Sequence, residues 1–320
     1  MAFPGLRLIA GLVGVVAVAG AVAAFLSTRQ EPAFDPAFDA SVAAPAWSER
    51  HPVVLFDEGH RNAHLSTTGY RPLVELIRND GYDVRVGSGL VTPASLAGVD
   101  ILVINGPRGA NDANGGPAFS EAEQQAIIDW VSGGGALLLV TDHWPFGVSV
   151  AGLSQRLGVQ VSGGMTSDPE HFEPGLGDTH IVYSRSNGLL RDHPVTAGRA
   201  AGERVSAVLT FTGQSMSVPA GAVAFMSVGD ASVEFPPAAP QVTRDGGDVR
   251  VSMTYGAAVP AGGRAQGIAF AFGDGRVVML GDAGMLRAQK DGANRIGMNR
   301  PGYDNRQLAL NIFHWLSRLT

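Results

Sequence analysis

The feature that most constrains how this chain can fold is an alternation, from residue 51 onward, of short apolar runs with longer amphipathic stretches. The apolar runs have the length of buried strands, whereas residues 70–80 and 120–131 have the spacing of amphipathic helices. Strands that alternate with helices pair in parallel, because each helix carries the chain back across the sheet. The first half therefore predicts a doubly wound parallel sheet. Its strands are expected at residues 53–56, 82–86, 101–104 and 136–141.

The later half is less regular and predicts some antiparallel pairing. Residues 273–275 read Gly-Asp-Gly, which is a hairpin signal between two neighbouring strands. Residues 231–265 are dense in Pro and Gly and predict a surface excursion. A closing helix is expected over residues 305–319, with its apolar side on the sheet. Further strands are expected at residues 205–212, 222–227, 249–254, 268–272 and 276–280.

An uninterrupted apolar segment covers residues 8–26, with Arg7 before it and Arg29 after it. As a helix it would be about 28 Å long, which is close to the hydrocarbon thickness of a bilayer. We therefore expect a single transmembrane signal-anchor helix within residues 1–29. A small-x-small pattern at residues 21–23 also fits signal-peptidase cleavage, so a secreted form stays open. Either form is exported, and the positive-inside tendency places the bulk on the periplasmic side of a bacterial inner membrane.

Composition bounds the remaining organisation and excludes several functions. Residues 30–50 are rich in Pro, Ala and Asp and predict a semi-extended linker, so the α/β domain is expected over residues 51–320. The absence of Cys removes disulfides, thiolate metal sites and a cysteine nucleophile. A net charge of -6 with a single Lys offers no basic face for nucleic acid. The chain also has no G-x-S-x-G elbow and no Walker loop.

The best functional signal is a set of polar residues that directly follow predicted apolar strands. In a parallel sheet all strands end at one edge, and ligands bind in the crevice beyond those ends. Segments that are far apart in the sequence are therefore expected to meet there. The candidates are Asp57, Glu58, His60, Asn62 and His64 after the first strand, Asn105 and Arg108 after the third, Asp142 and His143 after the fourth, and Asp282 after the late strand.

These residue types suit two kinds of chemistry. Imidazole and carboxylate are ligands for a divalent metal such as zinc, manganese or iron(II), and crowded carboxylates and imidazoles suit general acid–base catalysis. The alternative is structural, since such side chains often cap helices or hydrogen-bond loop backbone. We assign His60, His64, Asp142 and Asp282 to a metal, Asp57, Glu58 and His143 to catalysis, and Asn62, Asn105 and Arg108 to substrate binding.

Three segments carry a resemblance to a known family: residues 53–60 (VVLFDEGH), 133–143 (GGGALLLVTDH) and 275–282 (GRVVMLGD). In these the chain resembles the class I glutamine amidotransferase-like superfamily, and more narrowly its bacterial membrane-associated members, which are related in fold to trehalose-utilisation-like proteins. The resemblance covers most of residues 51–320 and implies a flavodoxin-like sheet. It does not imply glutaminase activity, because that family uses a nucleophilic Cys and this chain has none.

The narrower resemblance adds Asn305 and Arg306, at the start of the closing helix, as substrate-binding candidates; helix capping is their alternative role. Together these observations favour an envelope-anchored hydrolase or lyase that acts, with a divalent metal, on a small polar substrate such as a sugar derivative. The alternative is a non-catalytic ligand-binding or assembly module of an envelope complex. The sequence identifies no protein partner.

Overall fold

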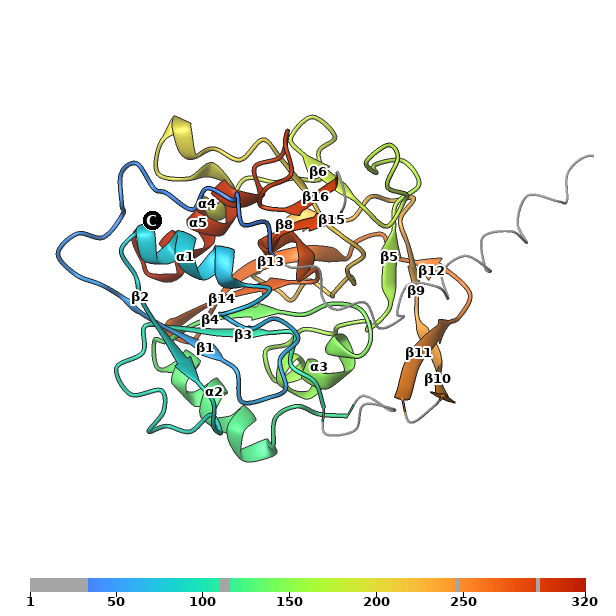
Figure 1. The fold of residues 1–320 in the computed structure, drawn as a ribbon, viewed down its shortest axis with the longest axis horizontal. Helices are drawn as coiled ribbons and strands as arrows, with labels where there is room; N and C mark the ends of the chain where they lie inside the picture. Colours follow the sequence, from blue (N-terminus) through green and yellow to red (C-terminus); the bar gives the residue numbers. More distant parts are fainter. Residues whose placement is uncertain (1–33, 110–115, 246–247, 292–293) are drawn as a thin grey trace, which may run out of the picture.

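A seven-stranded sheet forms the centre of the molecule (Figure 1). It is seen in a computed structural model, which describes residues 34–109, 116–245, 248–291 and 294–320. All the sheet's strands lie where the sequence predicted strands, within a few residues at each end. In spatial order they are β2 (Asp83–Gly87), β1 (Val53–Asp57), β3 (Ile101–Asn105), β4 (Ala136–Val140), β14 (Gly275–Leu280), β13 (Ala265–Phe272) and β8 (Val223–Ser227).

The first five strands of that order are parallel, and the last two complete the sheet with antiparallel pairing. The order β2-β1-β3-β4-β14 is the order of a flavodoxin-like sheet, with its reversal between β1 and β3. The predicted hairpin joins β13 to β14 through Gly273, whose φ of 59° is a left-handed conformation that favours glycine. The mixed α/β architecture with a mostly parallel sheet is therefore confirmed.

Helices cover both faces of the sheet and divide the core into two clusters. On one face pack α1 (Arg71–Asn79) and α5 (Asn305–Leu316); on the other pack α2 (Glu121–Ser132) and α3 (Phe146–Arg156) (Figure 1). Strand β4 alternates between them, since Leu138 belongs to the first cluster and Leu137 to the second. A strand buried on both faces needs an entirely apolar sequence, which β4 has.

Some helix boundaries follow from local sequence signals and others do not. The predicted capping box at the start of α2 is present, with Ser120 and Glu123 bonded reciprocally. Helix α5 ends at Leu316, before the predicted residue 319, and the strand predicted over residues 205–212 is reduced to β7 (Ala207–Leu209). The sequence did not predict α3, which begins after Pro145 without a side-chain cap.

The predicted surface excursion over residues 231–265 contains regular structure. Strand β9 (Val233–Phe235) pairs with β5 (Met165–Ser167) and β12 (Val259–Pro260) in a small sheet. Strands β10 (Pro237–Asp245) and β11 (Asp248–Tyr255) form a hairpin that projects from the domain (Figure 1). The remaining elements are β6 (Val182–Ser184), α4 (Pro194–Ala197), η2 (Ala201–Glu203), η3 (Gly284–Leu286), β15 (Ala288–Asp291) and β16 (Asn294–Gly297).

The described part of the predicted linker, residues 34–50, lies against the domain. The Asp35 N–H donates to the Ala288 carbonyl at 2.7 Å, and the Trp47 N–H donates to the Asp80 carbonyl at 3.1 Å. The apolar segment at residues 8–26, predicted to span a membrane, lies outside the described residues. Within the part of the chain that is described, no helix combines the length and the apolarity needed to cross a bilayer.

A buried histidine–carboxylate pair holds the closing helix on the domain. His314 Nε2 lies 2.7 Å from Asp80 Oδ2, and the other oxygen of Asp80 accepts the Ala46 N–H at 2.9 Å. The His314 and Asp80 side chains are 3 % and 1 % exposed, so water does not reach either group. Helix α5, the end of α1 and the segment over residues 34–50 therefore meet at one carboxylate.

We predict that His314→Ala lowers the free energy of unfolding by about 3 kcal/mol, because it leaves the Asp80 carboxylate buried beside a cavity. Urea denaturation followed by far-UV circular dichroism measures this loss. His51→Ala is the matched control, since exposed His51 bonds to the Gly81 carbonyl alone among the described residues, and it should cost less than about 1 kcal/mol. Equal losses for the two variants would contradict a structural role for the buried pair.

Candidate functional site

The parallel strands bring most of the predicted residues to one edge of the sheet. Asn105 at the end of β3 pairs with Val140 at the end of β4, and Val140 pairs with Leu280 at the end of β14. Asp142 and Asp282 each follow their strand by two residues, so neighbouring strands about 4.8 Å apart place the two carboxyl groups side by side. These residues therefore lie along one edge of the sheet. Its β1–β3 half and its β4–β14 half differ in their hydrogen bonds and in the exposure of their side chains.

The half formed by β1 and β3 is closed by a buried ionic bridge. His60 Nδ1 lies 2.7 Å from Asp57 Oδ1, and His60 Nε2 lies 2.9 Å from Glu123 Oε1. Glu123 Oε1 also accepts the Val91 N–H at 3.0 Å. The bridge thus ties the loop after β1 to the start of α2 and to the loop after β2. Both ring nitrogens of His60 face carboxylates, so neither has a lone pair directed at a metal.

Asn62 and Asn105 add hydrogen bonds between the loops that follow β1 and β3. The Asn62 amide donates to Asp57 Oδ2 at 3.2 Å and to the Asn105 carbonyl at 3.0 Å, while its oxygen accepts the His60 N–H at 3.1 Å. The Asn105 amide donates to the His64 carbonyl. Glu58 accepts the Ser66 N–H at 2.5 Å. These contacts are internal to the loops, so the crevice between β1 and β3 is filled by the protein's own side chains.

The pKa of His60 is set by two opposing effects, burial and its contacts with two carboxylates. Burial alone would lower the pKa of His60, but its hydrogen bonds to Asp57 and Glu123, and their charges, outweigh that effect and raise the pKa above the ordinary value. A protonated imidazole between two carboxylates satisfies all three groups. The described contacts favour a structural role for His60 and Asp57, and the metal-binding and catalytic roles predicted for them stay predictions.

The half formed by β4 and β14 holds two buried carboxyl groups. Asp142 accepts the His143 N–H at 2.8 Å and the Ala283 N–H at 3.0 Å. Asp282 accepts the N–H groups of Phe211 and Met285, both at 2.6 Å. Burial raises the pKa of Asp142, and burial together with the charge of Asp142 raises the pKa of Asp282. Like charges this close disfavour double ionisation, so the pair retains protons well above the ordinary range of a carboxyl group.

His143 completes this half of the edge. Its Nδ1 lies 2.8 Å from the Trp144 carbonyl, which requires Nδ1 to carry the proton, and its Nε2 lies 3.7 Å from Asp142 Oδ1. Burial lowers the pKa of His143 below its usual range. The side chains of His143 and Asp142 are 20 % and 12 % exposed, whereas Asp282 is fully buried. His143 and Asp142 are thus the members of the cluster that a ligand can touch.

His64 and Arg108 lie at the border of the edge. The His64 ring stacks on Tyr70, with 5.5 Å between ring centroids, and the Tyr70 hydroxyl donates to the Ala283 carbonyl at 3.1 Å. The Arg108 guanidinium lies over the Phe146 ring at 5.6 Å. Tyr70 therefore links the loop after β1 to the loop after β14.

Asn305 and Arg306 are engaged elsewhere. The Asn305 oxygen accepts the Leu209 N–H, and its amide donates to the carbonyls of Leu209 and Met285. Arg306 donates to the Ser41 carbonyl in the segment over residues 34–50. Both side chains hold structure together at the start of α5. The substrate-binding role predicted for Asn305 is therefore not favoured, because its polar atoms bond to backbone.

The residues present do not fit the predicted metal. Within residues 34–109, 116–245, 248–291 and 294–320, no group of three or more His, Asp or Glu side chains could hold a metal ion. His60 has both nitrogens in the bridge, and the oxygens of Asp142 and Asp282 accept backbone N–H groups. We derive no chemical step through a metal.

Sequence reasoning missed two partners of this edge. Glu123 was assigned only to the capping box, although its second carboxylate oxygen is what holds His60. Tyr70 was assigned only to the start of a helix. The available signal for Glu123 was its place in the first turn of the helix after β3, since helix N-termini share the edge where parallel strands end.

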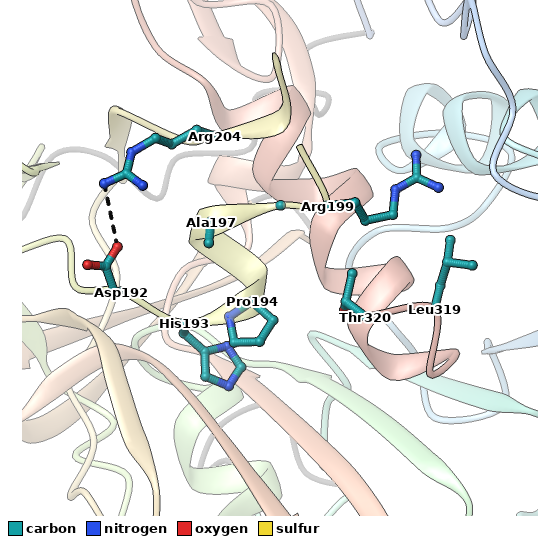
Figure 2. A pocket seen from close by; sticks show the side chains of 9 residues that line it. Asp192, His193, Pro194, Ala197, Arg199, Arg204, Leu319 and Thr320 are labelled. Carbon is teal, nitrogen blue, oxygen red and sulfur yellow. Dashed lines mark ion pairs between the residues drawn. The ribbon is translucent and has the colours of Figure 1, made fainter. Parts of the chain in front are cut away.

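A wide hollow of about 740 Å³ lies away from this edge, between α4 and the residues that follow α5 (Figure 2). Its charged side chains already have ion-pair partners: Arg204 lies 3.7 Å from Asp192 across the lining, and Arg199 lies 2.5 Å from Glu203, which is outside it. Burial lowers the pKa of His193 on its wall to about 4, so that imidazole is neutral. The hollow therefore offers room without the acid–base groups found at the edge of the sheet.

Comparison with known proteins defines the class at the level of fold. No family model matches this chain. A search of curated proteins gave no match. Among solved structures, the mmIFT52 N-terminal domain superposes with a TM-score of 0.57 at 17% identity, over 82% of this chain and 97% of that one.

Two ThuA-like proteins are also among the similar structures. The one from Bacteroides uniformis has a TM-score of 0.38 at 13% identity and covers 88% of this chain and 95% of its own. The one from Parabacteroides merdae has a TM-score of 0.43 at 12% identity and covers 84% and 90%. The likeness in fold rests on the mmIFT52 domain, and the membrane-associated branch suggested by the sequence stays a prediction.

The His60 bridge predicts a pH-dependent stability. The folded-state pKa of His60 lies above its unfolded value of about 6.5, so the stabilisation is complete below that pH and is lost as the pH rises through the folded pKa. We expect His60→Ala to cost about 3 kcal/mol of unfolding free energy at pH 6 and less at pH 9, measured by urea denaturation. A cost that is the same at both pH values would contradict a protonated bridge.

Proposed function

We propose that this protein is a hydrolase that uses Asp142 as general acid and His143 as general base on a small, polar, hydroxyl-bearing substrate. The observation that supports the proposal is the opposite direction of the two pKa shifts: burial raises that of the Asp142 carboxyl and lowers that of the His143 imidazole. Near neutral pH the carboxyl then keeps a proton to donate, and the imidazole keeps a lone pair to accept one.

The separation of the two groups restricts the reaction. His143 Nε2 and Asp142 Oδ1 are 3.7 Å apart, whereas the two carboxyl groups of a glycosidase stand about 5 to 9.5 Å apart on opposite sides of the bond. Groups this close act on one carbon from one side. That geometry suits addition of water to an acyl carbon, so an ester or lactone of a polyhydroxylated compound is the substrate class we propose.

The proton transfers balance within the pair. His143 Nε2 removes a proton from water as its oxygen forms a bond to the acyl carbon. Asp142 gives its proton to the alkoxide oxygen as the acyl C–O bond breaks, so the products are an acid and an alcohol. Proton transfer from the imidazolium to the Asp142 carboxylate then restores both groups. Asp282 is fully buried and acts as a positioning residue, holding the loop after β14 against Asp142.

One observation favours the alternative of a non-catalytic ligand-binding module. Both oxygens of Asp142 already accept backbone N–H groups, from His143 and Ala283, which is how a purely structural carboxyl group is held. In that case the edge would bind a polar ligand without transforming it. The same experiment separates the two functions.

Glucono-1,5-lactone and p-nitrophenyl acetate, followed by pH-stat and absorbance, are the probes. We expect turnover by the wild-type chain and losses of about 100-fold or more in kcat/KM for Asp142→Asn and for His143→Gln. The pH profile should be bell-shaped, with its limbs set by these two groups. Asp192→Asn, at an exposed carboxylate beside the hollow, is the matched control and should retain full activity.

Binding of the lactone without release of acid would support the non-catalytic module instead. Equal activity in the wild type and both variants would assign the reaction to other residues. Cleavage of p-nitrophenyl glycosides would contradict the one-sided geometry.

A further inference from the structure

A further polar group near the candidate site is the hydroxyl of Tyr255. The hydroxyl of Tyr255, the last residue of β11, is buried and has no hydrogen-bond partner among the residues that the structure describes. A buried hydroxyl left unpaired costs free energy, so folded proteins rarely retain one without a reason. Tyr70 and Tyr183, which are also buried, both use their hydroxyls, on the Ala283 carbonyl and on Gln266. Tyr255 is therefore the exception among the buried tyrosines near the sheet edge.

Contacts place Tyr255 beside the acid–base pair. It pairs with Pro237 across the β10–β11 hairpin, and the Pro237 ring lies 3.7 Å from the position that a Cβ on Gly163 would occupy. The Gly163 carbonyl accepts the Trp144 N–H at 2.8 Å, directly after His143 in the chain. Burial and the nearby charges of Asp142 and Glu234 raise the pKa of Tyr255, so its hydroxyl is protonated. The hairpin thus packs near the loop that carries His143, with the Tyr255 hydroxyl close enough to Asp142 to feel its charge.

The unpaired Tyr255 hydroxyl and the charge near it favour one kind of ligand. The Tyr255 hydroxyl can both donate and accept a hydrogen bond. The Glu234 carboxylate adds negative charge near Tyr255 and would repel an anionic ligand. A neutral ligand with hydroxyl groups can pair with the Tyr255 hydroxyl without that repulsion.

We propose that Tyr255 is a ligand-contacting residue of this site, and that its hydroxyl bonds a hydroxyl group of a neutral polyhydroxylated ligand. This inference rests on the proposed function, because it takes the Asp142–His143 edge as the binding site. It adds the β10–β11 hairpin to that site as the element that selects neutral over anionic sugars.

Tyr255→Phe separates a ligand contact from a structural one. Because the variant removes an unpaired polar atom, we expect its Tm to rise by about 2 °C. D-glucose and D-glucuronate, titrated against the full chain and followed by saturation-transfer NMR, are the probes. The wild type should bind glucose more tightly than glucuronate, and Tyr255→Phe should weaken glucose binding about three- to tenfold.

Tyr82→Phe is the matched control. The Tyr82 hydroxyl bonds to Ser317 at 2.9 Å, so this variant should lose stability and keep glucose binding. A fall in Tm for Tyr255→Phe would show a structural partner for its hydroxyl and overturn the inference. So would unchanged glucose binding in Tyr255→Phe alongside lost binding in Asp142→Asn, an outcome that leaves the proposed site intact. If no glucose binds to the wild type, the inference fails, and lactone turnover then decides the proposed function separately.

Discussion

The candidate site depends on the parallel pairing of β4 with β14. Because Val140 and Leu280 are in register, Asp142 and Asp282 leave the sheet together. Their backbone bonds to the loop after β14 keep Asp282 fully buried and Asp142 mostly buried. Desolvation then raises both pKa values, and the charge of one raises the pKa of the other further. A one-residue shift of either strand would point these side chains to opposite faces and remove the pair.

The usual ligand position in a sheet of this order is the crevice where the strand order reverses, between β1 and β3. Here that crevice holds the bridge of Asp57, His60 and Glu123, fastened by Asn62. A protonated imidazole between two buried carboxylates is stable only if all three remain, and it leaves no room for a ligand's own polar groups. The accessible acid–base groups therefore lie two strand pairs further along, at β4 and β14.

Much of the fold could be predicted from the sequence, because local pattern determined it. Signals of only a few residues were enough for three features: the all-apolar run of β4, the capping box at Ser120 and the hairpin at Gly273. Helix α3 carried no cap and was missed, and β10 lies in a Pro-rich stretch that locally predicts a loop. The edge that gathers the polar residues was predicted from topology, and Asp57, Asn105, Asp142 and Asp282 do lie along it. Their individual roles were not predictable, because they depend on partners distant in the sequence. Glu123 bonds to His60, and the backbone of Leu209 and Met285 bonds to Asn305. Tyr255 comes near the loop after β4 through the β10–β11 hairpin.

The central claim is that the Asp142 carboxyl stays protonated beside a neutral His143 near neutral pH. Carboxyl ¹³C NMR of the aspartate-labelled chain, titrated from acid to alkaline pH and assigned with Asp142→Asn and Asp282→Asn, tests it most directly. The account predicts that two aspartate resonances titrate near or above neutrality, and that the Asp282 midpoint falls once Asp142 is replaced. If both resonances instead titrate at about 4, as an ordinary aspartate does, the pair is ionised in the folded protein and cannot supply the proton.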